Sequence, residues 1–214
     1  MLNALHDRNY RRWLALWERL GASGNAFDVF RCLVWRYGEM CRSYHTLEHI
    51  DHCLTEFEQV RRFAKNPDAV EWAIWYHDAV ENPKEKDNVE QSTALATLVI
   101  KNVGLPDSFG QLVANLIMTS KHSVIPTDPD ARLFVDIDLS ILGQDEDYFD
   151  EYELRICREY DWMSKEKFVA GRSAILKSFI DRSSIYSTQF FRDKYEARAR
   201  QNITRSLAQL SQKS

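Results

Sequence analysis

The sequence has little glycine, little proline and no sustained alternation of apolar and polar residues. Only 7 glycines and 5 prolines occur among 214 residues, so the tight turns that connect many short strands would be scarce. Apolar residues instead recur three and four positions apart, as they do on the buried face of a helix. The pattern predicts an all-α protein with nine or ten helices.

Other absences narrow the class of protein. The four cysteines form no CxxC pair and no zinc-finger spacing. No secretory signal is recognisable, and no apolar run approaches the ~20 residues of a membrane span. The formal net charge is −4 and no basic stripe occurs, so nothing favours nucleic acid or anionic membranes. We therefore expect a cytoplasmic protein with reduced thiols and a small-molecule partner.

Several helix ends carry recognisable signals. Thr46 is expected to begin one helix, and Gly38 to end the helix before it. Asp68, with Glu71 three residues later, matches a capping box for a helix that should stop at Asn82-Pro83. Further helices are expected over 89–103, up to His122, from Asp128-Pro129 to Gly143, from Asp145, over 165–182 and over 188–211.

Asp138 is the first candidate for a metal ligand. On a helix, its neighbours at i±3 and i±4 are all apolar, so an unpaired carboxylate there would be costly. A metal ion would compensate for that cost, and so would a salt bridge to a buried arginine. Asp136 is the weaker candidate, because Arg132 at i−4 offers it an ordinary surface pairing. The apolar neighbours of Asp138 are Phe134, Val135, Ile141 and Leu142.

His77 and Asp78 stand together near the end of a predicted helix. His77 offers an imidazole nitrogen and Asp78 a carboxylate oxygen, and a metal between helices could reach both. Considered alone, the dipeptide is better explained as a polar pair at a helix terminus. It gains weight only from the other candidate ligands.

Three histidines follow one another at helical spacing. His45, His49 and His52 fall at i, i+4 and i+7, so they could share one stripe. His49 is the best ligand candidate because it lies inside the predicted helix. His45, at or just before the helix start, suits a proton donor to a leaving group. His122 could be a further ligand, a substrate contact or a cation favoured at a helix C-terminus.

The order His49 (or His45), His77-Asp78 and Asp138 resembles the HD superfamily of metal-dependent phosphohydrolases. The resemblance implies an HD-type all-helical core with a C-terminal helical extension. Tyr44-His-x-x-x-His49 and Asp138-Leu-Ser140 are similar to the cyclic-nucleotide phosphodiesterase versions of the first and last motifs. In those enzymes the first histidine is the general acid and the second is a ligand. The resemblance therefore implies that His45 is the acid and His49 the ligand.

A narrower resemblance is to an uncharacterised bacterial group of predicted metal-dependent HD-superfamily phosphohydrolases. It covers about residues 40–202 and implies one domain over 1–214, with the metal-site core at about 40–145 and C-terminal helices at about 146–214. The matching motifs are Arg42-x-Tyr44-His45-x-x-x-His49-Ile50, Trp75-Tyr76-His77-Asp78, Thr119-x-x-His122, Asp136-x-Asp138-Leu139-x-Ile141-Leu142-Gly143, Glu159-Tyr160, Gly171-Arg172, Arg182, Ile185-Tyr186 and Arg200-x-Asn202.

One departure from the group is informative. Glu81 stands where a tyrosine is usual, which creates the pattern His77-Asp78-x-x-Glu81. This pattern resembles HD nucleotidases in which such a glutamate helps to activate water or to donate a proton. The alternative is that Glu81 is simply exposed to solvent beside Asn82-Pro83.

The resulting hypothesis is hydrolysis of a small phosphate ester, such as a nucleotide or a related phosphomonoester or phosphodiester. His49, His77, Asp78 and Asp138 would hold a divalent ion: Mn, Ni, Co, Fe, Zn or, with more carboxylates, Mg. The ion would lower the pKa of a bound water. The catalytic residues would be Asp78 and either His45 or Glu81 as proton donor. If His122 joined, Asp78 could also bridge to a second ion.

Alternatives stay open at this point. Lys121, Arg158 and Arg172 could contact phosphate, or they could be surface and structural charges. A di-iron oxygenase on the same fold and a non-catalytic module that binds nucleotide or metal are the rival functions. The sequence leaves the substrate, the number of metal ions and the choice between monomer and homodimer undecided.

Overall fold

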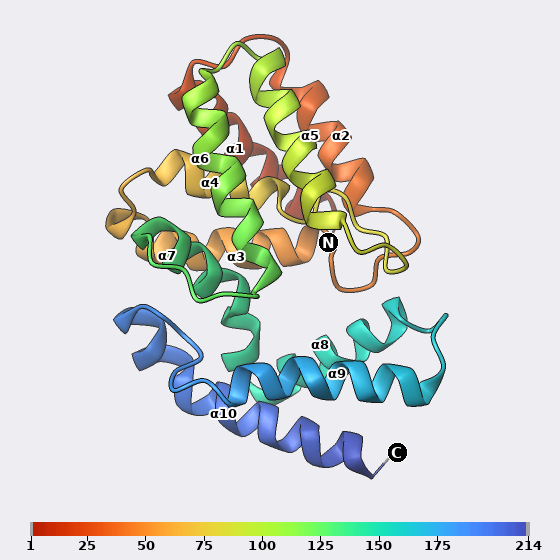
Figure 1. The fold of residues 1–214 in the computed structure, drawn as a ribbon. Coiled ribbons are helices and arrows are strands. Elements are labelled where there is room, and N and C mark those ends of the chain that lie inside the picture. Colours follow the sequence, from red (N-terminus) through yellow and green to blue (C-terminus); the bar gives the residue numbers. More distant parts are fainter. Residues whose placement is uncertain (1, 213–214) are drawn as a thin grey trace. The chain divides into compact units, whose positions relative to one another are not determined.

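The computed structural model describes residues 2–212, and within them the chain is helical, with ten α-helices, three short 3-10 helices and no strand (Figure 1). The prediction of an all-α fold is confirmed. The chain divides into two compact units, Met1–Val135 and Asp136–Ser214. The single domain over 1–214, with its core at about 40–145, stays a prediction.

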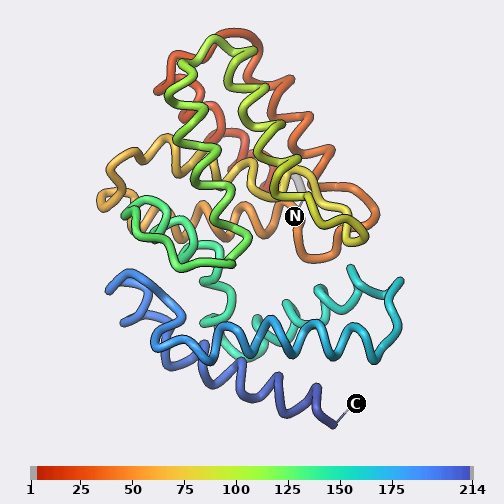
Figure 2. Tube along the Cα trace, viewed as in Figure 1, coloured from red at the N-terminus to blue at the C-terminus, as the bar shows by residue number. Residues whose placement is uncertain are grey.

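The first unit contains six complete helices and the start of a seventh. Helices α5 and α6 lie side by side, as the chain trace in Figure 2 shows. The helices are α1 (Leu2–Leu20), α2 (Ala26–Tyr37), α3 (Leu47–Val60), α4 (Pro67–Tyr76), α5 (Asn88–Asn102), α6 (Asp107–Met118) and α7 (Pro129–Asp138), with η1 (Arg61–Phe63) after α3 and η2 (Thr119–Lys121) after α6. The unit boundary therefore falls inside α7.

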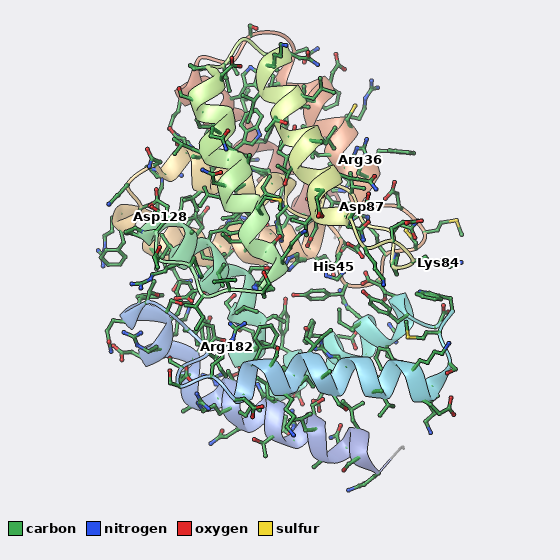
Figure 3. All side chains as sticks on the ribbon, in the orientation of Figure 1. Arg36, His45, Lys84, Asp87, Asp128 and Arg182 are labelled. Atoms are coloured by element: carbon green, nitrogen blue, oxygen red, sulfur yellow. The ribbon has the colours of Figure 1, made fainter. Side chains whose placement is uncertain are left out.

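Local signals place several of these helix ends correctly. The Thr46 hydroxyl accepts a hydrogen bond from the backbone N–H of Glu48, so Thr46 caps α3 as expected. Gly38 ends α2. The Asp128 carboxylate accepts the backbone N–H of Ala131 at 3.0 Å and caps α7 (Figure 3). At these positions, contacts within a few residues along the chain are enough to determine where the helix begins or ends.

The predicted capping box of α4 is wrong. The helix begins with Pro67 in its first turn, and its N-cap residue makes no side-chain cap hydrogen bond. Asp68 and Glu71 instead form ion pairs with Arg19 and Arg61. Proline is already suited to the first helical position, and charge-assisted bonds to two arginines outcompete the weaker capping bonds.

The predicted end of α4 is also wrong. The helix ends at Tyr76 rather than at Asn82-Pro83, and His77 is its C-cap residue. Beyond it, the backbone N–H of Val80 donates to the Ser92 hydroxyl at 3.0 Å, and that hydroxyl donates back to the Val80 carbonyl at 3.2 Å. These bonds to α5 take the place of helical partners, so the chain turns soon after α4.

An aromatic cluster holds α4 in place. Trp13, Trp72 and Trp75 have no exposed surface, and the Trp13 ring centroid lies 5.2 Å from that of Trp72 and 5.6 Å from that of Trp75. Burial of a large apolar side chain stabilises by about 1.5–3 kcal/mol. The cluster therefore anchors the helix whose end carries His77.

The second unit consists of η3 (Leu139–Gly143), α8 (Glu146–Glu159), α9 (Lys165–Ile180) and α10 (Gln189–Ser211). Helices α9 and α10 lie side by side (Figure 1). The Asn202 amide of α10 donates to the carbonyls of Leu142 and Gln144, both at 2.9 Å. This unit thus closes its first turn against its last helix.

Asp136 is not the surface residue that the sequence suggested. Its side chain is buried and accepts hydrogen bonds from the backbone N–H groups of Ser187 and Thr188 and from the Thr188 hydroxyl, at 2.6–2.8 Å. Arg132 instead donates to the carbonyl of Pro126. Burial raises the pKa of Asp136 to about 6. The carboxylate accepts hydrogen bonds at the N-terminus of α10, where backbone N–H groups lack helical partners. The predicted surface pairing of Asp136 with Arg132 is therefore wrong.

The longest helix, α10, has 23 residues and is rich in charged and polar side chains. Within residues 2–212, no helix combines the length and apolar character that a bilayer crossing requires. The cytoplasmic location and the oligomeric state stay predictions.

The contact between Gly143 and α10 gives a stability prediction. A Cβ atom on Gly143 would collide with the side-chain stem of Tyr195, whereas a Cβ on Gly171 of α9 would meet nothing within 4 Å. Gly143→Ala should destabilise the fold by about 1–3 kcal/mol. Gly171→Ala should stabilise it by roughly 0.5–1 kcal/mol because alanine favours the helix. Urea unfolding of both variants checks this, and equal midpoints would contradict the packing described.

Glu196 of α10 carries a second, pH-dependent prediction. Its carboxylate accepts the backbone N–H groups of Ile185 and Tyr186, at 3.1 and 3.2 Å. The Ser184 hydroxyl and the Arg200 guanidinium donate to the same carboxylate, at 3.1 and 2.7 Å. Burial alone would raise the pKa of Glu196, but these hydrogen bonds outweigh it and lower the pKa below its usual value.

Because the folded-state pKa is depressed, Glu196 stabilises the fold fully above its unfolded pKa of about 4.3. That stabilisation is lost as the pH falls through the folded-state pKa. Glu196→Gln should therefore cost about 1–3 kcal/mol at neutral pH, and the difference from wild type should shrink in acid. Urea titrations at a series of pH values measure it; a pH-independent difference would show that the ionised carboxylate is not responsible.

Candidate metal centre

Two chain segments of the first unit bring candidate ligands together. His49 is the third residue of α3, and its position follows from the Thr46 cap that fixes where this helix begins. His77 and Asp78 follow the last residue of α4. The rings of His49 and His77 are both buried, and Asp78 is partly buried. The centre is therefore formed where one helix starts and another stops.

Three ligand atoms from these residues converge. His49 Nε2 and His77 Nε2 lie 3.1 Å apart. Asp78 Oδ2 lies 3.1 Å from His77 Nε2 and 3.4 Å from His49 Nε2. Two imidazole nitrogens and one carboxylate oxygen aimed at the same point are a donor set that transition metals accept. With both imidazoles buried, this group could hold a metal ion.

A backbone contact decides which nitrogen of His77 faces the centre with a lone pair. His77 Nδ1 lies 3.0 Å from the carbonyl oxygen of Ile74. A carbonyl can only accept, so Nδ1 carries the proton. In a neutral ring with this tautomer, Nε2 carries the lone pair, which is the usual arrangement of a metal-binding histidine.

The charge of Asp78 suits the same role. Burial alone would raise the pKa of its carboxyl group, but the neighbouring His77, His45 and His49 outweigh burial and hold the pKa well below its usual range. The carboxylate therefore stays ionised and supplies a negative ligand. A bound cation would also lower the pKa of Asp78 and so favour the ionised carboxylate.

His45 lies in the segment that precedes α3 (Figure 3). Its ring centroid is 6.0 Å from that of His49 and 5.0 Å from that of Tyr44. It is close enough to Asp78 to lower the pKa of that carboxyl group. Its location beside the ligands, but outside the three-atom group, is compatible with a proton donor.

Glu81 lies in the turn that follows His77 and Asp78. It is partly exposed, and its carboxylate accepts a hydrogen bond from the Asn88 amide at 3.3 Å. Glu81 is thus on the same turn as the ligands but is held by the start of α5.

His122 and Asp138 each lie at the end of a helical segment. His122 is the residue after η2 and has a left-handed backbone with φ of 52°, a conformation that costs free energy for a residue with a Cβ atom. It is partly buried. Asp138 is the last residue of α7 and belongs to the second unit; it is also partly buried.

The three candidate phosphate contacts are paired with the protein's own carboxylates. Lys121 pairs with Glu90, and the exposed Arg158 lies 3.9 Å from Glu151. Arg172 is buried and bonds to Glu153 and to the Tyr152 hydroxyl. These contacts fit structural charges better than phosphate binding.

Sequence reasoning gave no role to the residues that hold the turn after α4. Ser92 binds the backbone of Val80, and the Asn88 amide group exchanges hydrogen bonds with the backbone of Asn82, at 3.1 and 2.9 Å. Their signal in the sequence is weak, because polar residues in the first turns of a helix are common. Their contribution is to fix the path of the chain just beyond Asp78.

Comparisons of the sequence and structure with protein-family models, with curated proteins and with solved structures find no match. The candidate centre therefore has to be judged on its own geometry. Membership of the HD superfamily stays a prediction.

The convergence of the three ligand atoms predicts metal binding that depends on His77. Titration of the metal-free protein with Mn or Zn should show a tight site, and His77→Ala should weaken the metal affinity by at least ~100-fold. Loss of a residue that only orients a ligand already costs about 10–100-fold in affinity, and loss of a ligand should cost at least as much. His6→Ala, in α1, is the matched control and should leave the affinity unchanged. Calorimetry measures both; similar loss in the two variants would mean that the ion binds elsewhere.

Proposed function

We propose that the protein is a divalent-metal-dependent hydrolase of a small phosphate ester. The observation that carries the proposal is the meeting of His49 Nε2, His77 Nε2 and Asp78 Oδ2 within 3.4 Å of one another. A buried site of this kind suits a cation, since it gathers two imidazole nitrogens and one negatively charged carboxylate.

The donor set fits several divalent ions. Two imidazoles and a carboxylate suit Mn, Fe, Co, Ni or Zn, whereas Mg would need more oxygen ligands. When bound, such an ion would lower the pKa of a coordinated water and polarise a phosphoryl oxygen. The chain's own residues would then orient the ester and move the protons.

Asp138 is the proposed remaining ligand. Phe134, one turn earlier on α7, packs edge-on against the His77 ring, with the centroids 5.7 Å apart. Residues four apart lie on the same face of a helix, about 6 Å along its axis. Asp138 therefore lies on the same face of α7 as Phe134, which supports its choice as the remaining ligand.

The protons would be handled by Asp78 and His45. Asp78 Oδ2 faces the two imidazoles, which leaves Oδ1 to accept the proton of the attacking water. His45 would donate a proton to the leaving oxygen, so that it departs as a neutral alcohol. Glu81 is the alternative donor, because it lies on the same turn as Asp78.

Membership of the HD superfamily is part of the proposal. The support comes from the order of the ligands along the chain, His49, His77-Asp78 and Asp138, together with the all-α fold. A nucleotide or a related phosphomonoester or phosphodiester is the proposed substrate class.

Activity should depend on the Asp78 carboxylate. Phosphate or alcohol release from a panel of nucleotides, cyclic nucleotides and sugar phosphates, assayed with Mn, Ni, Co or Zn, should identify a substrate. Asp78→Asn should lower kcat/KM for it by at least ~100-fold, as expected when a proton acceptor and ligand is lost. Asp28→Asn, an exposed residue of α2, is the matched control and should retain full activity.

Elemental analysis of each preparation accompanies the assay. A wild-type protein that carries its metal but hydrolyses nothing, and that binds nucleotides as well as Asp78→Asn does, would replace the hydrolase with a binding module.

A further inference from the structure

Arg42 links the two chain segments that carry the candidate catalytic groups. One of its terminal nitrogens, Nη1, donates to the carbonyl of His45 at 2.9 Å and to the carbonyl of Asp78 at 2.7 Å. The other, Nη2, donates to the carbonyl of Ala79 at 3.3 Å. A single guanidinium therefore spans the loop before α3 and the turn after α4.

The guanidinium is held firmly. Its side chain is fully buried, its Nε donates to the Glu39 carboxylate at 3.2 Å, and its plane lies over the Tyr37 ring at 5.2 Å. The Tyr37 hydroxyl in turn donates to the carbonyl of Trp75 in α4 at 2.8 Å. A flat group with several donors in fixed directions can meet all of these partners at once.

Lysine cannot reproduce this arrangement. Its ammonium group is a compact point charge on a flexible stem. It therefore cannot bridge three carbonyls and a carboxylate in the way that the fixed N–H directions of the planar guanidinium allow. Arg42→Lys keeps the positive charge and most of the apolar stem. The substitution therefore tests the geometry of the contact separately from its charge.

The two segments are not equally dependent on Arg42. The turn after α4 is also held by Ser92, through both backbone groups of Val80, and by the aromatic packing of α4. The ligand His49 lies inside α3, whose start is fixed by Thr46. His45 lies in the loop outside that helix, so loss of the bond to its carbonyl should displace its ring more than it displaces the metal ligands.

We propose that Arg42 is a positioning residue that keeps His45 aligned, as proton donor, with the metal-held phosphate ester. The inference rests on the proposed hydrolase function. Arg42 touches neither substrate nor metal; it acts by fixing the distance between the backbone of His45 and that of Asp78.

The test compares two phosphate esters that differ only in the leaving group. Nitrophenolate leaves without help, whereas an alkoxide needs a proton from an acid. Arg42→Lys should lower kcat for the alkyl ester by at least ~30-fold and for the nitrophenyl ester by less than ~3-fold, because misplacing the acid forfeits part of the 10²–10⁴-fold that general-acid catalysis contributes. His45→Ala should show the same selectivity. The double variant should be no worse than His45→Ala, because both changes remove one function.

Two further variants control for folding. Arg61→Lys changes another arginine of the first unit, one that pairs with Asp68 and Glu71, and should affect both esters equally or not at all. If Arg42→Lys does not fold, Glu39→Gln weakens the same guanidinium through its Nε contact and should show the same selectivity, to a smaller degree.

The outcomes separate the inference from the function on which it rests. Equal losses on the two esters, or losses that multiply in the double variant, would overturn the role of Arg42 while leaving the hydrolase intact. A wild-type protein that holds metal but is inert on both esters would overturn the hydrolase, and the role of Arg42 with it.

Discussion

The candidate centre depends on one electrostatic constraint: two buried imidazoles and a carboxylate need a positive charge among them. The His77 proton is directed away from the centre, toward the Ile74 carbonyl, and the Asp78 carboxyl group is ionised because histidines surround it. A divalent ion satisfies all three groups at once, which is why metal binding follows from the geometry more directly than any reaction does.

The end of α4 carries two of the candidate ligands. His77 still has helical backbone angles, and its N–H bonds to the Ala73 carbonyl, whereas the Ala79 N–H closes a tighter turn onto the Tyr76 carbonyl. At this turn, Asp78 Oδ2 lies 3.1 Å from His77 Nε2. The prediction of a longer helix therefore failed at the position that matters most to the site.

Local interactions were predictable from the sequence and distant ones were not. Thr46 and Asp128 cap helices through bonds to residues two or three positions away, and patterns of neighbouring residues report such bonds well. Asp136 bonds to residues about 50 positions away. Asp68 and Glu71 bond to Arg19, equally distant in the sequence. No pattern of neighbouring residues reveals such partners, so a local pairing was assigned in each case.

The candidate site shows the same division. Histidine and aspartate are common metal ligands, so His49, His77 and Asp78 could be singled out from the sequence alone. Arg42 appeared only as one residue of a motif, and Asn88 and Ser92 were given no role, because the importance of these residues lies in the backbone groups that they satisfy.

Those backbone groups follow from the end of α4 itself. A helix that stops leaves its last carbonyls without helical partners, and buried carbonyls without partners are costly. In the turn after α4, Arg42 donates hydrogen bonds to the carbonyls of Asp78 and Ala79, and the Ser92 hydroxyl donates one to the carbonyl of Val80. The turn that carries the two adjacent candidate ligands thus has backbone carbonyls that a buried arginine satisfies, and that arginine also reaches the loop of His45. Arg42 in this way connects the turn of the candidate ligands with the loop that places His45.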